Sequence, residues 1–141
     1  MLRIRTVLSI LLLLAAAAPM ASARPSIGAQ ELQGKVSVKL LQELAANGTA
    51  LFFVVMAEHA DLSPAANLPT KQAKGEFVYQ ALKSTAERTQ ADLLALLTAR
   101  GIPFKSYFIS NMVLTQGNLA LVNELAARGD VARVEANTAH Q

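Results

Sequence analysis

The chain of 141 residues contains no cysteine and no tryptophan, and its only histidines are His59 and His140. Without cysteine it can form no disulfide and no thiolate metal site, so a folded domain must depend on its apolar core or on a partner. Neither histidine has a histidine or acidic neighbour at metal-ligand spacing such as H-x-x-x-H. We therefore expect no metal and no cofactor, and we interpret His59 as a solvated residue at the end of a strand.

Catalytic motifs are equally scarce. The sequence has no G-x-S-x-G segment and no glycine-rich phosphate loop, and its seven glycines stand singly at expected turns. Asp61 and Asp92 have no flanking segments typical of a Ser-His-Asp triad. We expect Asp61 to lie in a turn before Pro64 and Asp92 on the polar face of a helix. The residues present favour a domain that is not an enzyme.

The first two dozen residues have the parts of a signal peptide. Arg3 and Arg5 precede an apolar run from Val7 to Ala18, and Ala21-Ser22-Ala23 forms a small-x-small cleavage triplet. The run is short for a membrane span of about 20 residues. We expect residues 1–23 to be removed after Ala23 and the mature chain to be secreted, with no membrane contact afterwards.

The charge of the mature chain excludes little and favours no nucleic acid. Removing Arg3 and Arg5 from the 13 basic residues leaves 11 against 10 acidic ones, so the net charge falls from +3 to about +1. The remaining charges are scattered along the chain, whereas a nucleic-acid-binding domain gathers them on one face.

The mature chain is long enough for one domain. Residues 24–48 are expected to form a linker, rich in Pro, Ser, Gly and Gln as far as Gly34, and a short helix from Val38 to Ala46 that ends at Asn47-Gly48. Residues 49–141 should hold the main domain. Its first element is the apolar run Leu51–Ala57, which predicts a central strand.

The rest of the chain alternates helical and strand patterns. A long connection is expected from His59 to Lys74, followed by a helix of about 25 residues from Gly75 that ends at Gly101. Two strands, 104–109 and 112–115, should follow, then a turn at Gln116-Gly117-Asn118 in which Asn118 caps a helix from Leu119 to Arg128. The last predicted strand is Val131–Glu135.

This order, βαββαβ, predicts an α+β fold of the ferredoxin-like type: an antiparallel sheet with two helices on one face, preceded by the signal peptide and the short helix. One face of such a sheet has no helix over it. An uncovered sheet face presents a patch that a monomer would rather bury, so it needs an explanation.

Several segments, in their order and spacing, resemble the propeptide of secreted bacterial subtilisin-like serine proteases. They are Leu51–Glu58 (LFFVVMAE), Ala60–Ser63 (ADLS), Lys74–Tyr79 (KGEFVY), Leu82, Thr85-Ala86, Gln90, Gly101, Tyr107–Asn111 (YFISN) and Asp130–Asn137 (DVARVEAN). The similarity spans residues 39–137. The Asp-Thr-Gly, His-Gly-Thr and Gly-Thr-Ser-Met segments of the catalytic domain are absent.

The resemblance implies a protease inhibitor that also acts as an intramolecular chaperone. In this family the bare sheet face packs on the protease, and the C-terminal tail enters the substrate cleft as a cleaved product would. Carried over by position, the cleft-binding tail consists of Ala136, Asn137, Thr138, Ala139, His140 and Gln141.

Other interpretations stay open at this stage. The chain is a stand-alone inhibitor, a fragment of a longer protease precursor, or a non-functional remnant of one; alternatively, it is a ferredoxin-like module that binds a ligand or buries its sheet face in a homodimer. The sequence does not say which protease is the partner, whether the free domain folds fully, or its oligomeric state.

Overall fold

The computed structural model describes residues 34–137. The expected signal peptide, nearly all of the linker, and Thr138 to Gln141 lie outside these residues. The described part is an α+β structure with one four-stranded antiparallel sheet and three α-helices. Its elements in chain order are α2 (Val38–Asn47), β1 (Thr49–Met56), the 3-10 turn η1 (Ser63–Asn67), α3 (Lys71–Ala99), β2 (Phe104–Tyr107), β3 (Met112–Asn118), α4 (Leu119–Ala126) and β4 (Val131–Ala136).

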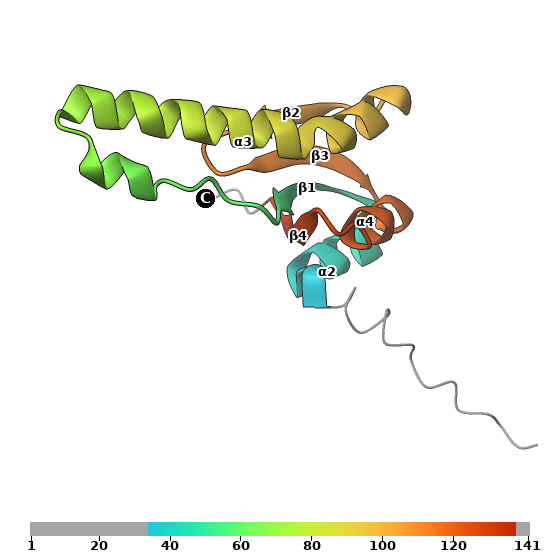
Figure 1. Ribbon diagram of the computed structural model, residues 1–141. Coiled ribbons are helices and arrows are strands. Elements are labelled where there is room, and N and C mark those ends of the chain that lie inside the picture. The colour runs from blue at the N-terminus through green and yellow to red at the C-terminus, as the bar shows by residue number, and fades with distance from the viewer. Residues whose placement is uncertain (1–33, 138–141) are drawn as a thin grey trace, which may run out of the picture.

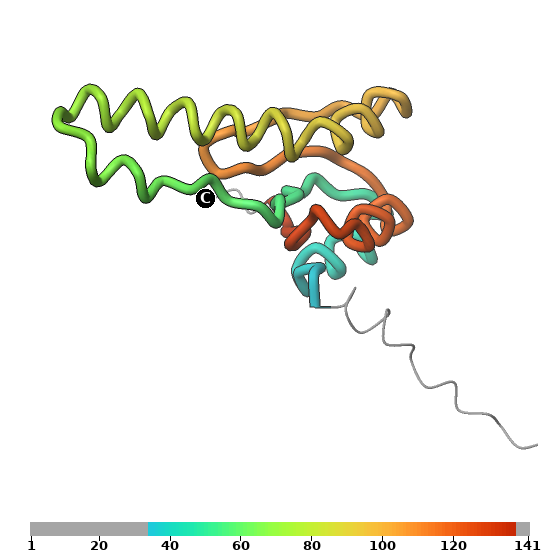
Figure 2. The backbone as a smooth tube through the Cα atoms, viewed as in Figure 1, coloured from blue at the N-terminus to red at the C-terminus, as the bar shows by residue number. Residues whose placement is uncertain are grey.

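The sheet has the order β2-β3-β1-β4, so the first strand lies in its centre between two strands that come late in the chain. Val54 faces Val113 of β3 on one side and Val134 of β4 on the other. β2 pairs only with β3. The backbone trace shows α3 and α4 as the connections that cross the sheet (Figure 2).

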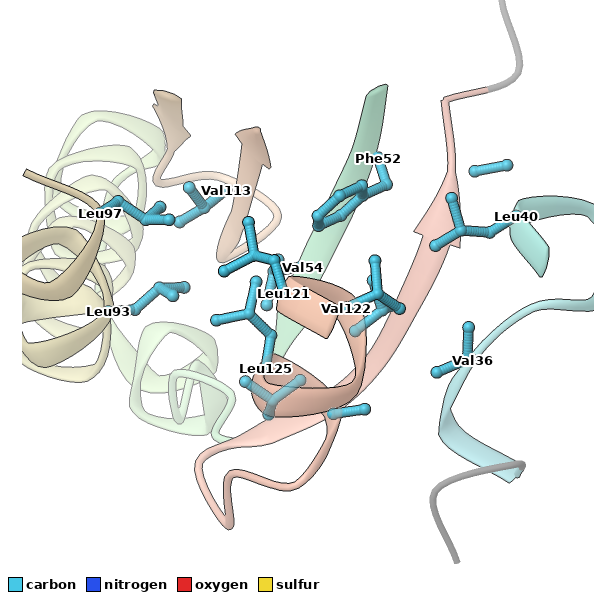
Figure 3. Packing of buried hydrophobic residues seen from close by; sticks show 14 of the residues in the cluster. Val36, Leu40, Phe52, Val54, Leu93, Leu97, Val113, Leu121, Val122 and Leu125 are labelled. Carbon is cyan, nitrogen blue, oxygen red and sulfur yellow. The ribbon is translucent and has the colours of Figure 1, made fainter. Parts of the chain in front are cut away.

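Alternation along the strands places one set of side chains in a single core. Phe52, Val54 and Met56 of β1 are fully buried and belong to the same apolar cluster as residues of α2, α3 and α4. Figure 3 shows Leu93 and Leu97 of α3 beside Val113, and the α4 residues Leu121, Val122 and Leu125 over the middle of the sheet. All three helices therefore contribute to the same face of the sheet.

α3 is longer than the sheet that it covers. Its buried residues begin only at Thr85, while its first half, from Lys71 to Ser84, has none. This half projects beyond the sheet with η1 beside it (Figure 1).

Most predicted elements are confirmed, with different limits. α3 begins at Lys71 rather than Gly75 because Thr70 accepts a hydrogen bond from the Ala73 amide and caps the helix. The predicted strand 104–109 ends at Tyr107, and the helix predicted to Arg128 ends at Ala126. Asn118 caps α4 as expected, by accepting from the Leu121 amide at 3.1 Å.

The predicted turn at Gln116-Gly117-Asn118 is wrong. These residues continue β3, where Gln116 pairs with Leu51 and Gly117 with Ala50. Glycine suits this position because a Cβ on Gly117 would lie 2.5 Å from Leu121 Cδ2 and the leucine side chain would have to shift. The glycine thus permits α4 to pack closely on the strand, and does not mark a reversal of the chain.

The short helix α2 belongs to the same core as the sheet. Leu40 and Leu44 are buried in the common cluster, as is Val36 just before the helix. Residues 35–37, which we call the strap, lie beside β4, and Val36 forms a parallel bridge with Val134. The boundary expected at residues 48 and 49 is therefore a loop within one packed unit.

In residues 34–137, no helix is both long enough and apolar enough to cross a membrane.

Candidate functional site

The sheet face opposite the helices is the first candidate site. Because side chains alternate, Leu51, Phe53 and Val55 of β1 point away from the core. The strand register places Leu114 beside Phe53 and Met112 beside Val55. Tyr107 of β2 faces Met112 and so joins the same surface. We call these six residues the open face.

The open face is apolar in its centre and charged at its borders. The Phe53 and Tyr107 rings meet edge to face with centroids 5.9 Å apart. On the β2 side, the ammonium group of Lys105 lies 5.1 Å from the centre of the Tyr107 ring. On the β4 side, Arg133 and Glu135 form an ion pair. The arrangement is that of an interface with an apolar core and a polar rim.

No helix in the described part of the chain packs on the open face, because the buried apolar residues of α2 and α4, and Leu93 and Leu97 of α3, belong to the core on the other side. Leu51 retains 43% of its surface, and Phe53, Tyr107, Met112 and Leu114 are half-buried. Val55 is only 3% exposed. The open face is therefore a continuous apolar surface available to a partner.

The structure divides the six residues of the expected tail. Ala136 is the last residue of β4, faces Phe52 and is only 8% exposed. Asn137 continues the ladder, since its amide donates to the Leu51 carbonyl at 3.1 Å. Thr138, Ala139, His140 and Gln141 lie outside the described residues. Any extended tail thus starts at Thr138. The four residues from Thr138 to Gln141 would span about 13 Å if fully extended.

The strap holds the end of β4 from its outer edge. The Ser37 amide donates to the Val134 carbonyl at 3.0 Å, and the Ser37 hydroxyl oxygen accepts from the Ala136 amide at 3.2 Å. Lys35 donates to the carbonyls of Arg128 and Val131. The open face and the start of the tail are thereby built from one rigid sheet.

A buried polar network lies at the opposite end of β1, on the helix side. The side-chain amide of Asn111 donates to the Glu58 carbonyl at 2.8 Å, and its oxygen accepts from Gln90 at 2.9 Å. Gln90 in turn accepts from the Ser106 hydroxyl at 2.6 Å. The network joins α3, the β2–β3 turn and the chain after β1, and we assign it a structural role.

Two hollows accompany these features. One, of about 500 Å³, lies between the end of α3, the end of β3 and the start of α4, and the ion-paired Arg100 and Glu124 are among the residues that line it. The other, of about 320 Å³, is apolar and lies between His59, Leu62, Leu82 and the β2–β3 turn. Neither hollow contains a set of groups arranged for a defined reaction.

The polar residues singled out in the sequence are dispersed. His59 is exposed and Asp92 lies on the exposed side of α3. Asp61 accepts from the Ser63 amide in a turn, and hydrogen bonding to the Ser63 side chain, with a smaller contribution from this amide, lowers the pKa of its carboxyl. Within residues 34–137, no three His, Cys, Asp or Glu side chains come together as a metal site.

Ion pairs account for the other pKa shifts. The hydrogen bonds from Arg128 lower the pKa of the Asp130 carboxyl, and those from Arg88 lower that of Glu58. Asp130 is the most enclosed of these acids and lies in the turn that leads into β4.

Sequence reasoning missed Lys35 and Ser37. Ser37 had a recognisable signal, since a serine directly before an apolar helical pattern is a favoured N-cap. No local signal indicated its contact with β4, because Ser37 and Ala136 are far apart in the chain.

Comparison with known proteins gives no match: no family model, no curated protein and no solved structure is similar to this chain.

Proposed function

We propose that this chain is a secreted inhibitor of a subtilisin-like serine protease, with a ferredoxin-like fold of the propeptide type. The proposal includes removal of residues 1–23, docking of the protease on the open face, and entry of the tail from Thr138 to Gln141 into the substrate cleft. A chaperone role in folding of the protease belongs to the same proposal. The domain itself performs no catalysis.

The observation that carries this proposal is the open face. A domain without cysteine has apolar and aromatic side chains on a regular sheet surface that no described helix covers, bordered by charged groups. Such a surface suits a large, flat contact with another protein better than it suits a small molecule.

The position of the chain end supports the second part of the mechanism. Asn137, the last described residue, is hydrogen-bonded to Leu51 at one end of the open face. A partner docked on that face would have the next residues within reach. An extended tail can add main-chain hydrogen bonds to a strand of the enzyme.

The test is inhibition of subtilisin-like proteases by the mature chain, residues 24–141, on a chromogenic peptide. We expect competitive inhibition that disappears when Thr138 to Gln141 are deleted. Leu51→Lys should weaken inhibition on the order of tenfold or more, because it places a charge in the contact. Leu119→Lys, at a similarly exposed leucine on α4, is the matched control and should change it by less than about twofold.

A second candidate uses the same open face: self-association of two copies. Sedimentation analysis separates the two. A concentration-dependent dimer that Leu51→Lys disrupts, together with no inhibition of any protease at high micromolar concentration, would replace the inhibitor proposal with the dimeric module.

A further inference from the structure

Ser37 connects two elements that are distant in sequence. Its hydroxyl oxygen accepts from the Leu40 amide at 3.3 Å, which caps α2, and from the Ala136 amide at 3.2 Å, which belongs to the last residue of β4. The side chain of one half-buried residue thus fixes both the start of a helix and the end of the final strand.

The surroundings make this a firm attachment. Val36, beside Ser37, is buried and bridges to Val134, while Leu40 is fully buried in the core. Lys35 is tied to two carbonyls of the α4–β4 turn. The strap therefore cannot shift along β4 without breaking apolar contacts and hydrogen bonds on both sides.

At the end of β4, hydrogen bonds hold the backbone from both edges. Ala136 donates outward to Ser37, and the next residue, Asn137, donates inward to the Leu51 carbonyl at 3.1 Å. Asn137 is the residue from which the tail continues. These two bonds fix the backbone of the last two described residues.

We propose that Ser37 is a positioning residue for the inhibitory tail. Its hydrogen bond to the Ala136 amide orders the backbone at the end of β4 before the protease binds. Less conformational entropy is then lost at this point when the tail enters the cleft. This inference rests on the proposed function, in which the tail is the part that blocks the cleft. Preorganisation of a binding segment raises affinity by lowering the entropy lost on binding.

The experiment compares Ser37→Ala with two controls in the full mature chain. Ser37→Thr keeps a hydroxyl and caps a helix. Gly48→Ala strains the other end of α2, where Gly48 has φ 75°, without touching the strap. The first readout is amide hydrogen exchange at Ala136 and Asn137 in the free domain. The second is the inhibition constant, and the third is affinity for the same protease after a peptidyl chloromethyl ketone has filled its cleft.

We expect Ser37→Ala to speed exchange at Ala136 and Asn137 and to weaken inhibition, each by about fivefold, as loss of one hydrogen bond predicts. Its affinity for the blocked protease should not change. Ser37→Thr and Gly48→Ala should match the original chain at these two amides and in inhibition.

Three results would overturn the inference: unchanged exchange in Ser37→Ala, an equal loss of inhibition in Gly48→Ala, or an equal loss of affinity for the blocked protease. If the original chain inhibits no protease, the proposed function fails. The exchange measurement then still decides whether Ser37 fixes the end of β4.

Discussion

Asn111 is the residue whose replacement should reveal most about how this disulfide-free domain is held together. It is 6% exposed, has φ 46°, and its side chain bonds to both Gln90 and the Glu58 carbonyl. In the described residues no buried side-chain nitrogen or oxygen lacks a hydrogen-bond partner. Asn111→Ala would create one at Gln90, which is 1% exposed.

The expected loss can be estimated from the separate contributions. An unpaired buried amide on Gln90 costs about 1–3 kcal/mol. Alanine in the left-handed region adds about 1 kcal/mol of backbone strain. We therefore expect Asn111→Ala to lower the free energy of unfolding by roughly 3 kcal/mol, a large part of the ~5–15 kcal/mol typical of a domain.

Urea and thermal unfolding followed by circular dichroism measure this loss, and the melting temperature should fall by roughly 10–20 °C. Asn111→Gly removes the strain but not the unpaired amide, so it should recover about 1 kcal/mol. Gln90→Met added to Asn111→Ala should also recover part of the loss, because it removes the unpaired group. A loss below about 1 kcal/mol for Asn111→Ala would refute this account of the network.

The remaining predictions concern two glycines and one ion pair. Gly117→Ala should destabilise the domain by about 1–3 kcal/mol, because the new Cβ would lie 2.5 Å from Leu121 Cδ2. Gly75→Ala should raise helix stability by about 1 kcal/mol, because Gly75 lies in the interior of α3 and a Cβ added there would have open space around it. Unfolding curves of the two variants check both signs. The pKa of Asp130 is lowered by the hydrogen bonds from Arg128, so the folded state binds this proton less readily than the unfolded state. The stabilisation is complete above the pKa of the unfolded state, near 4, and is lost as the pH falls through the pKa of the folded state. Asp130→Asn should therefore be less stable than the original chain at pH 7 and approach its stability below about pH 4. Unfolding measured at several pH values checks this.

Helices with strong end signals could be predicted well from the sequence. Asn118 caps α4 and Gly48 ends α2 with φ 75°, both as expected from residue type. The start of α3 could not be placed from its apolar pattern, because its first turns face no core. Thr70 after Pro69 was the local signal for that start.

The errors arise where long-range packing decides the local structure. Gln116 and Gly117 have the composition of a turn, but pairing with β1 and the contact with Leu121 keep them in β3. The predicted strand after Phe104 ends early because Asn111 closes a turn with positive φ. Likewise, only the fold shows that the strap lies beside β4 and that Ala136 is part of the sheet.

The open face follows from the sequence only in part. The continuous apolar run Leu51–Ala57 gives β1 apolar side chains on both faces, but it does not show which residues of other strands lie beside them. The register adds Met112, Leu114 and Tyr107, and with them the continuous surface.

The strand order also has a consequence for the speed of folding. β1 is made early, but its neighbours are β3 and β4, which are separated from it by all of α3 and β2. Long loops must therefore close before the pairing of β1 with β3 or β4 can contribute stability. Topologies of this kind fold slowly. β1 therefore remains unpaired until β3 has been made, and the four-stranded sheet is complete only when β4 has followed. A binding partner that recognises the finished sheet can bind only after that step.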